Sequence, residues 1–402
     1  MLSLPMKLYK NLVNSVAETL QEIFTKNRYA DKAIEKLFQQ NPQWGSRDRR
    51  FVAEAVYDIV RNYRLYSELA QSQKNFWFIT AVWLVVKEIE FPDWQEFKHV
   101  DKNFILREKE NFKTNLPVYE SYPDWLWNLG TKELGKEIWE REALAMNKQA
   151  PVVLRVNTLK ISGEKFEEAF KLQNIQLKKV DGVADAYELV KRENVFQNKL
   201  FKEGWFEVQD AGSQQISEFV NPKMNEYIID ACAGAGGKTL HLASLMKNKG
   251  KVVSLDVGDY KLEELKKRAK RAGAFNVEAR LIEDSKTIKR LEGKADRVLL
   301  DVPCSGLGVL KRNPDAKWKL SEETVNKTKD LQQKILLDYS VMVKPGGSLF
   351  YSTCSILPSE NKEQVDKFLA SDENFKFVKD KTILPSEGFD GFYMCELIRT
   401  AS

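Results

Sequence analysis

From Asn225 onward the chain repeats short runs of aliphatic and β-branched residues, each followed by a turn and a stretch with helical spacing. Short apolar runs that alternate with amphipathic helices are typical of α/β folds, here a doubly wound parallel sheet with helices on both faces. Ligands of such sheets bind at the carboxyl ends of the strands. The polar residues that end the apolar runs therefore indicate where a site lies, and they are Asp230, Asp256, Asp284, Asp301 and Cys354.

Two other regions precede this pattern, and we expect each to fold separately. Residues 1–148 carry apolar residues at helical spacing and predict an all-helical domain. Residues 149–222 predict a small α+β subdomain that begins at Ala150-Pro151, and residues 223–402 predict a Rossmann-like catalytic domain of the doubly wound type. Helices are expected within residues 10–30, 51–60, 76–89 and 125–145, with Ser46 or Asp48 as the N-cap before the second of them.

Composition excludes several classes of protein. Four cysteines without a CxxC pair fit neither a disulfide framework nor a zinc ribbon, and two histidines argue against a His-built metal centre. The longest apolar run has eleven residues, whereas a membrane helix needs roughly 20. The first residues lack the features of a signal peptide. We therefore expect a cytoplasmic protein with reduced thiols, no metal and no membrane anchor. Its net charge of +5 favours a nucleic-acid partner only where basic groups cluster.

The glycine-rich turn DACAGAGGKT lies between a predicted strand and a predicted helix. A phosphate-binding P-loop requires glycine where Cys232 stands, and a dinucleotide motif that starts at Gly234 requires glycine where Thr239 stands, so both fail in their strict forms. An adenosyl ligand without a pyrophosphate needs close backbone approach and acidic groups for its hydroxyls. Asp256 is placed for the ribose hydroxyls and Asp284 for an adenine amino group, which predicts S-adenosyl-L-methionine. A tight turn beside solvated acids is the alternative.

Cys304 and Cys354 each follow a predicted strand, 50 residues apart in sequence. A lone cysteine is usually a small buried hydrophobe, but two thiols at the mouth of a methyl-donor site indicate covalent catalysis. A thiolate that adds to carbon 6 of a pyrimidine turns carbon 5 into a nucleophile that can accept a methyl group. Asp301 is placed to stabilise the adduct, and a carboxylate suits the amino group of cytosine better than the carbonyl of uracil. Cys232 and Cys395 are expected to be structural.

Residues Val153–Ser402 resemble the Sun-type (Nop/Sun) RNA cytosine-carbon-5 methyltransferases. The matching stretches, together with Asp284, are LRVNTLK, VQDAGSQ, DACAGAGGKT, LDVGDYKL, DVPCSGLGVLKRNPDAKW, PGGSLFYSTCS and GFDGFYM. The stretch GSRDRRFVAEAVYDIVR is similar to the N-terminal region of the bacterial ribosomal-RNA members, which implies that the helical domain 1–148 binds RNA. The resemblance implies a methyltransferase that acts on cytosine in 16S ribosomal RNA, with transfer RNA as the alternative substrate. We expect it to act as a monomer.

The resemblance also implies roles for individual residues. Cys354 is the expected nucleophile, Cys304 is expected to assist product release, and Asp301 is expected to contact the target cytosine base. The expected cofactor site comprises Cys232, Ala233, Gly234, Ala235, Gly236, Gly237, Lys238, Asp256, Lys261, Asp284 and Asp301. The chain departs from the family at Gly234-Ala235, where Ala-Pro is usual, which removes a fixed φ from the loop. It also has Lys261 where arginine is common, which replaces a planar donor by a point charge.

RNA contacts are predicted on both sides of this site. The candidates are Lys311, Arg312, Lys317 and Trp318 in the loop after Cys304, and Arg155 and Asn157 in the α+β subdomain. A solvated surface charge is the alternative for each cation. Two other functions remain open at this point. One is a DNA methyltransferase in which Cys304 attacks, and the other is a non-catalytic RNA-binding or ribosome-assembly factor that retains the fold.

Overall fold

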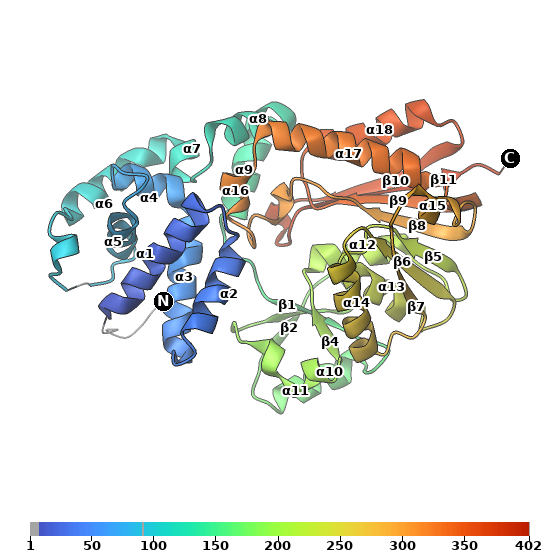
Figure 1. The fold of residues 1–402 in the computed structure, drawn as a ribbon, viewed down its shortest axis with the longest axis horizontal. Coiled ribbons are helices and arrows are strands. Elements are labelled where there is room, and N and C mark those ends of the chain that lie inside the picture. Colours follow the sequence, from blue (N-terminus) through green and yellow to red (C-terminus); the bar gives the residue numbers. More distant parts are fainter. Residues whose placement is uncertain (1–7, 91, 402) are drawn as a thin grey trace. The chain divides into compact units, whose positions relative to one another are not determined.

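The computed structural model describes residues 8–90 and 92–401 (Figure 1). The chain divides into two compact units. The helical unit comprises residues 1–147 together with residues 310–322, and the sheet unit comprises residues 148–309 and 323–402. Residues 310–322, which we call the insertion, therefore interrupt the sheet unit in sequence and belong to the helical unit.

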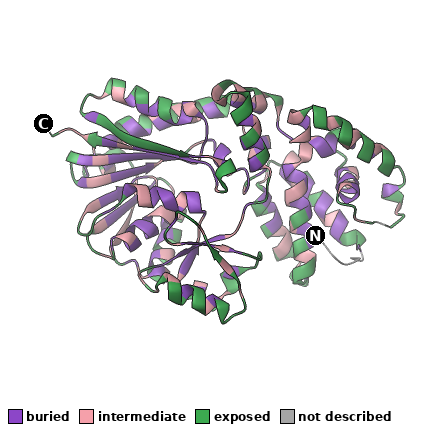
Figure 2. Cartoon of the chain, turned by 180° about the vertical axis from the view of Figure 1, so that it is seen from behind, coloured by how far each residue is buried: buried purple, intermediate pink, exposed green. Residues whose placement is uncertain are grey.

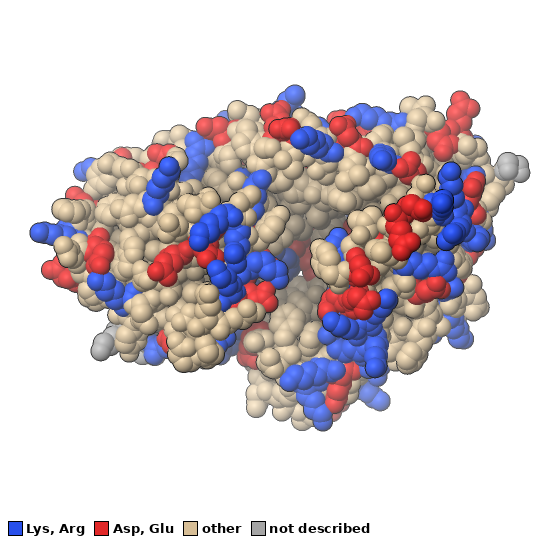
Figure 3. Space-filling view, viewed as in Figure 1, with Lys and Arg blue, Asp and Glu red and all other residues tan. Residues whose placement is uncertain are grey.

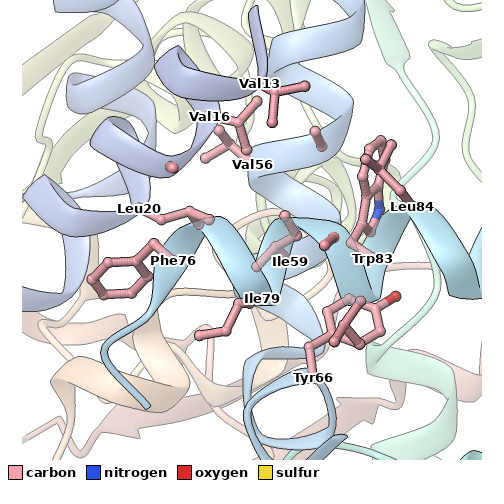
Figure 4. Close-up of a cluster of buried hydrophobic side chains, with 14 of the residues drawn as sticks. Val13, Val16, Leu20, Val56, Ile59, Tyr66, Phe76, Ile79, Trp83 and Leu84 are labelled. Atoms are coloured by element: carbon pink, nitrogen blue, oxygen red, sulfur yellow. The ribbon is translucent and has the colours of Figure 1, made fainter. Parts of the chain in front are cut away.

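The helical unit is built around α1, α3 and α5, whose apolar faces meet in one core. Figure 4 shows Val13, Val16 and Leu20 of α1 facing Val56 and Ile59 of α3, with Ile79 and Trp83 of α5 beside them. The spacing of these residues places them on one side of each helix, which explains the prediction. The helices of this unit are α1 Lys10–Thr25, α2 Ala30–Gln40, α3 Ser46–Arg61, α4 Tyr63–Leu69, α5 Phe76–Val86, α6 Lys102–Asn111, α7 Leu116–Tyr119, α8 Asp124–Leu134, α9 Lys136–Met146 and α16 Ala316–Lys319.

Local details of the helical prediction are corrected. The single helix expected over residues 125–145 is two helices, α8 and α9, because Gly135 adopts a φ of +79° and ends the first. The helix α3 begins at Ser46, and its N-cap is Gly45 without a side-chain hydrogen bond, so the expected caps Ser46 and Asp48 are wrong. The first helix ends at Thr25 and α5 ends at Val86, each a few residues earlier than expected.

A four-stranded antiparallel sheet opens the sheet unit, in the order β2-β3-β1-β4. Its strands are β1 Val153–Val156, β2 Leu177–Lys179, β3 Ala186–Leu189 and β4 Phe206–Val208, with the helices α10 Gly163–Lys171 and α11 Lys199–Lys202. Phe166 and Phe170 of α10 pack with Tyr187 and Phe206 of the sheet in a separate small core. Strands and helices are both present here, in agreement with the α+β character that the sequence predicts for this region.

The second sheet has seven strands in the order β10-β11-β9-β8-β5-β6-β7. Five of them are parallel, namely β5 Tyr227–Asp230, β6 Lys251–Asp256, β7 Val277–Leu281, β8 Ala295–Asp301 and β9 Val343–Thr353. The strands β11 Phe392–Arg399 and β10 Phe375–Ile383 add an antiparallel pair at one edge. The predicted doubly wound α/β fold is confirmed, and the antiparallel pair is the part that the sequence reading missed.

Helices cover both faces of this sheet (Figure 1). One face carries α12 Ala211–Val220, α13 Gly237–Leu245 and α14 Asp259–Ala272, and the other carries α15 Ser285–Lys289, α17 Glu322–Ser340 and α18 Lys362–Ser371. Neighbouring residues of a strand alternate between the faces: Val298 packs toward α17 and α18, and Leu299 packs toward α12 and α13. The central strands β5, β6 and β8 are accordingly buried on both sides along most of their length, whereas the helices expose one side (Figure 2).

The strand order fixes where a ligand site is expected. The chain runs from β5 outward to β6 and β7, and then returns to place β8 on the opposite side of β5. The crevice at such a switch point is the usual ligand site of open α/β sheets. The strands β5, β6 and β8 end at Asp230, Asp256 and Asp301, and β9 ends one residue before Cys354. Among the described residues, no helix combines the length and the apolar character that crossing a bilayer would require.

Candidate active site

The structure brings the two predicted thiols into contact. Cys304 Sγ lies 3.1 Å from Cys354 Sγ, and the backbone N–H of Cys354 donates to Cys304 Sγ at 3.3 Å. The contact follows from the sheet, because β8 and β9 are parallel neighbours with Asp301 opposite Ser352. Both thiols are partly exposed at the carboxyl edge, so a substrate can reach them.

The environment distinguishes Cys304 from its partner. The hydrogen bond with Cys354 raises the pKa of the Cys304 thiol well above its ordinary value, and burial and the nearby Glu360 carboxylate act in the same direction. We therefore expect Cys304 to keep its proton at neutral pH.

Asp301 and Lys238 form an ion pair next to the thiols. Lys238 Nζ lies 2.5 Å from Asp301 Oδ2, and the hydroxyl of Ser352 donates to Asp301 Oδ1 at 3.0 Å. Burial alone lowers the pKa of the Lys238 ammonium, but the Asp301 carboxylate outweighs this effect and the pKa is raised. The ion pair thus holds the Asp301 carboxylate in place at the switch point of the sheet. The carboxylate has lone pairs left, with which it can accept a hydrogen bond from a ligand.

The glycine-rich loop at residues 232–238, which is predicted to hold the methyl donor and is called the donor loop below, is hydrogen-bonded to the end of β6. Asp256 accepts hydrogen bonds from the backbone N–H of Gly234 at 2.9 Å and of Gly258 at 2.8 Å, and its carboxylate lies 3.3 Å from Lys261 Nζ. Gly236 has a φ of +85°, and a Cβ there would meet the Leu265 side chain at 2.7 Å, so glycine is required. The structure thereby joins three predicted cofactor residues, Gly234, Asp256 and Lys261, in one bonded cluster.

This loop fits an adenosyl group. A Cβ built at Gly234 meets nothing within 4 Å, and one at Gly237 meets only the Gln209 side chain at 3.8 Å, so the loop leaves open space along its backbone. Asp256 Oδ2 accepts one hydrogen bond from the protein, which leaves a further acceptor site for a hydroxyl. The donor set is oxygen and backbone nitrogen, as a nucleoside requires.

The other two acids at the strand ends differ in their surroundings. Asp230 is buried beneath the loop and accepts from the Thr239 hydroxyl at 2.7 Å, and burial raises its pKa to about 7. It anchors the start of α13. Asp284 is exposed and caps α15 by accepting from the backbone N–H of Lys286 at 2.8 Å. Asp284 lies at the end of the neighbouring strand β7, outside the bonded cluster around Asp256.

Arg155 and Asn157 are buried in the sheet unit, which corrects their predicted role as RNA contacts. The Arg155 side chain donates to the carbonyl of Gly237 at 2.7 Å and to the Gln209 side chain, and burial lowers its pKa to about 10. Asn157 donates to the carbonyls of Gly204 and Ala272, each at 2.8 Å. Both side chains connect the four-stranded sheet with the seven-stranded part, and neither reaches solvent.

Three of the four RNA contacts predicted in the insertion are packed within the helical unit instead, which corrects their predicted role. Lys317 is 1% exposed, and its ammonium donates to Arg61 O at 2.8 Å and to Asn147 Oδ1 at 2.9 Å. Burial lowers its pKa well below the ordinary value. Trp318 donates to the carbonyl of Val60 at 2.7 Å, and Lys311 is buried with its carbonyl bound to Arg61. These three residues are core elements of the helical unit.

Arg312 is half-buried and stays a predicted RNA contact. On the face shown in Figure 3, basic and acidic side chains are interspersed within each unit, so the mild net charge of +5 is not gathered into one region of that face. Local groups must supply the contacts to RNA.

Sequence reasoning missed the residues that brace the loops. The Arg268 guanidinium donates to the carbonyl of Ala235 at 2.8 Å and pairs with Glu207 at 2.9 Å. Glu360 lies under both thiol loops and is fully buried. Its only sequence signal was the polar run PSEN after the Cys354 loop, which is not specific to any role. These braces join segments far apart in sequence, so no local pattern reveals them.

The seven-stranded sheet, the glycine-rich loop after β5 and the acids at the strand ends define the Rossmann-like methyltransferase class. The family model for the 16S rRNA methyltransferase RsmB/F matches residues 217–397, and the model for the ferredoxin-like domain of RsmF/B-like methyltransferases matches residues 122–196. The probable ribosomal RNA small subunit methyltransferase B of Synechocystis is 30% identical over 401 residues, which cover 89% of this chain and 88% of that protein. The chain belongs to this family of ribosomal RNA methyltransferases.

Two further relatives agree with that membership. The ribosomal RNA small subunit methyltransferase B of Vibrio vulnificus is 35% identical over 290 residues, which cover 70% of this chain and 67% of that protein. The crystal structure of PH0851 matches with a TM-score of 0.80 at 25% identity, and the match covers 98% of this chain and 100% of that one. The protein is therefore an RNA methyltransferase with a Rossmann-like fold.

Proposed function

We propose that this chain transfers a methyl group from S-adenosyl-L-methionine to carbon 5 of a cytosine in 16S ribosomal RNA, through a covalent adduct between Cys354 and carbon 6. The observation that carries the proposal is the 3.1 Å contact between the Cys304 and Cys354 thiols beside the Lys238–Asp301 pair. Methyl transfer to nitrogen or oxygen uses an existing lone pair and needs no thiol. A pyrimidine carbon 5 needs a nucleophile at carbon 6, and this site holds one.

The sequence of bond changes assigns each thiol a task. The Cys354 thiolate forms a bond to carbon 6, and the electron pair of the 5,6 double bond moves to make carbon 5 nucleophilic. Carbon 5 then takes the methyl group, and the electron pair of the broken sulfur–methyl bond stays on the sulfur of the methyl donor. A base removes the carbon 5 proton, and the bond to Cys354 breaks, with its electron pair on sulfur, as the double bond is restored. The raised pKa of Cys304 keeps it protonated, so it can donate a hydrogen bond to the departing Cys354 sulfur and assist release.

Asp301 is the residue that selects the base. Its carboxylate accepts from the exocyclic amino group of cytosine, where a uracil would present a carbonyl oxygen to another acceptor. Lys238 holds the carboxylate in place at 2.5 Å and balances its charge in a partly buried site. Because the ammonium keeps its proton in this pair, the carboxylate remains a fixed acceptor while the ring is bound.

Residues of the donor loop would hold the cofactor. Residues 232–238 present their backbone to it, Asp256 accepts from the ribose hydroxyls, and Lys261 and Asp284 flank the adenosine. S-adenosyl-L-methionine supplies the methyl group as an electrophile. The resemblance of the chain to small-subunit ribosomal RNA methyltransferases supports 16S ribosomal RNA as the substrate. Four free cysteines and a ribosomal substrate support a cytoplasmic location, and we propose that the chain acts as a monomer.

The proposal is tested by release of tritium from RNA labelled at carbon 5 of cytosine. Wild-type protein should release tritium when supplied with S-adenosyl-L-methionine and 16S ribosomal RNA, and Cys354→Ala should release none. Cys304→Ala should accumulate an RNA–protein adduct that survives denaturation, because the adduct forms but is not resolved. Cys395→Ala, a buried thiol far along the chain in β11, is the matched control and should retain activity.

Two results would redirect the proposal. If Cys354→Ala accumulates the adduct and Cys304→Ala does not, the two thiols exchange roles, as in the DNA-type reaction. If the wild-type protein binds S-adenosyl-L-methionine but releases no tritium from any ribosomal RNA, cytosine-carbon-5 methylation is excluded. A calorimetric titration with the cofactor accompanies the assay so that failure to bind and failure to react are told apart.

A further inference from the structure

A buried carboxylate connects the two loops that carry the thiols. Glu360 ends the 3₁₀ turn Pro358–Glu360, which follows β9 and the Cys354 loop, and its side chain is 0% exposed. The reaction proposed above does not use it. Carboxylates are rarely buried in full unless their oxygens are hydrogen-bonded. The partners of Glu360 therefore decide what it does.

Those partners are the residues that directly follow each thiol. Glu360 Oε1 accepts from the backbone N–H of Ser305 at 2.7 Å, and Oε2 accepts from the hydroxyls of Ser305 and Ser355, the latter at 2.5 Å. Ser305 follows Cys304, and Ser355 follows Cys354. One carboxylate thus bonds both loops within one residue of each sulfur.

A third element is joined to the same oxygen. The amide of Gln332 in α17 donates to Glu360 Oε1 at 3.1 Å and to the carbonyl of Pro303 at 3.0 Å. A backbone N–H and an amide NH₂ are obligate donors, so Oε1 is an unprotonated acceptor. Gln332 holds the residue before Cys304, and Glu360 holds the residue after it.

The Cys354 loop is fixed in the same way from its other side. Asn361, the neighbour of Glu360, donates to the carbonyl of Ser355 at 3.0 Å and accepts from the Thr353 hydroxyl at 2.5 Å. The hydroxyl of Tyr351 donates to the backbone carbonyl of Glu360 at 2.7 Å. The turn at Glu360 is therefore anchored to β9, and its carboxylate reaches from there to the Cys304 loop.

We propose that Glu360 is a positioning residue that holds the Cys304 and Cys354 loops in the arrangement that brings the two sulfurs into contact. The inference rests on the proposed function and deepens it, since it concerns the same two thiols. Without the carboxylate, the Ser305 N–H would lose its acceptor and the Gln332 amide would keep only the Pro303 carbonyl, so the loops would move to satisfy the stranded donors. A displacement of about 1 Å at a reacting group is enough to cost about 10²-fold in rate.

The experiment uses the full chain and compares four variants with the wild type. Glu360→Ala removes both acceptor oxygens, and Glu360→Gln keeps an oxygen for the Ser305 N–H and the Gln332 amide while its NH₂ faces the two hydroxyls. Ser355→Ala removes one contact and remains informative if Glu360→Ala does not fold. The matched control is Asp296→Asn. Asp296 is a partly buried carboxylate at the opposite end of β8 that accepts from the Tyr227 N–H at 2.7 Å.

Two measurements are made on each variant. The first is the kcat and the KM for RNA in the tritium-release assay. The second is the rate at which diamide oxidises Cys304 and Cys354 to a disulfide in protein without RNA or cofactor, with the linkage identified by peptide mass spectrometry. In that reaction the two thiols lose two protons and two electrons to diamide. Its rate reports how often the sulfurs meet, which a general loss of stability does not change below the unfolding transition.

We expect Glu360→Ala to lower kcat by about 10²-fold with little change in KM, and to slow disulfide formation by about tenfold or more. Glu360→Gln should recover most of both rates, Ser355→Ala should show a smaller loss of each, and Asp296→Asn should match the wild type. The inference is overturned if Glu360→Ala folds and keeps the wild-type disulfide rate and kcat, or if Asp296→Asn loses as much. If the wild type releases no tritium, the proposed function fails, while the disulfide rate still measures the positioning.

Discussion

The stretch DVPCSGLGVLKRNPDAKW is one unbroken motif in the sequence, but its two halves have different roles in the structure. Asp301 to Val309 end β8 and carry Cys304 in the sheet unit, whereas the insertion that begins at Leu310 belongs to the core of the helical unit. A motif that resembles an enzyme family from end to end thus combines chemistry with architecture. Nearness to Cys304 in sequence did not tell the two apart.

A comparison of Lys238 with Lys317 shows how the two roles can be distinguished. Lys238 faces the Asp301 carboxylate, and its pKa is raised. Lys317 faces the carbonyls of Arg61 and Glu120 and the ring of Tyr122, with no carboxylate bound, and burial lowers its pKa. An ammonium paired with a carboxylate at a strand end can take part in chemistry, whereas one enclosed by neutral acceptors holds a core together.

The largest effect is expected from Asp301→Asn in the first half of the motif. The substitution removes the charge that pairs with Lys238 and presents an amide NH₂ where the cytosine amino group needs an acceptor. We expect kcat to fall by about 10²–10³-fold, the range seen when one preorganised electrostatic contact is lost. Single-turnover tritium release measures it, with the thermal unfolding midpoint as the control for folding. A kcat within about threefold of the wild type would remove Asp301 from the chemistry.

Lys317→Met in the second half should act on stability instead. The variant keeps the aliphatic volume but removes the Lys317 hydrogen bonds to Arg61 O and Asn147 Oδ1. Glu120 O also loses its bond to Lys317 but keeps the one that the Asn147 amide donates at 2.6 Å. We expect a loss of about 1–3 kcal/mol, the cost of stranding buried acceptors. Urea unfolding followed by tryptophan fluorescence is suitable, because every tryptophan except Trp205 lies in the helical unit. An unchanged midpoint with a raised KM for RNA would instead support the original RNA-contact prediction.

Much of the site could be predicted because its determinants are local. A strand followed by a glycine turn and an acid is visible in sequence, so the edge that joins Gly234, Asp256 and the two cysteines was expected. The burial of Lys317 could not be predicted, since its partners are Arg61 of α3 and Asn147, the residue after α9, more than 150 residues earlier in the chain. The sequence alone likewise predicts Arg155 as a surface cation, because its partner, the Gly237 carbonyl, comes close only in the folded chain.

The edge strand β10 and the Glu360 contacts were also missed because neither leaves a local pattern in the sequence. The strand β10 is exposed along most of its length, so it lacks the apolar run that marked the buried parallel strands. Glu360 binds residues from the β8 loop, the β9 loop and α17, and only the assembled sheet brings these together. Hydrophobic periodicity shows which face of a single segment is buried. A polar contact among three segments produces no periodic pattern in any of them.

The two lysines also predict opposite responses of stability to pH. The folded-state pKa of Lys317 lies below the unfolded value near 10.5, so between the two the unfolded state binds more protons and stability rises with pH. For Lys238 the folded-state pKa is raised, so its contribution is complete below the unfolded pKa and is lost as pH rises through the folded one. The difference in urea midpoint between wild type and Lys317→Met should grow from pH 7 to pH 10. A constant difference would mean that burial does not lower the pKa of Lys317.

The smallest effect is expected from Asp315→Asn, the same exchange as Asp301→Asn made within the insertion. Asp315 accepts from the Ala30 N–H at 3.0 Å, and an asparagine oxygen can keep that bond, so at neutral pH we expect a change of about 1 kcal/mol or less and an unaltered kcat. Burial raises the pKa of Asp315, so the folded state binds the proton more tightly and the wild type loses stability as pH rises through that window. Relative to the wild type, the variant should therefore gain stability between pH 4 and pH 7 in urea titrations. A loss of kcat comparable to that of Asp301→Asn would show that the two halves of the motif are not divided in function.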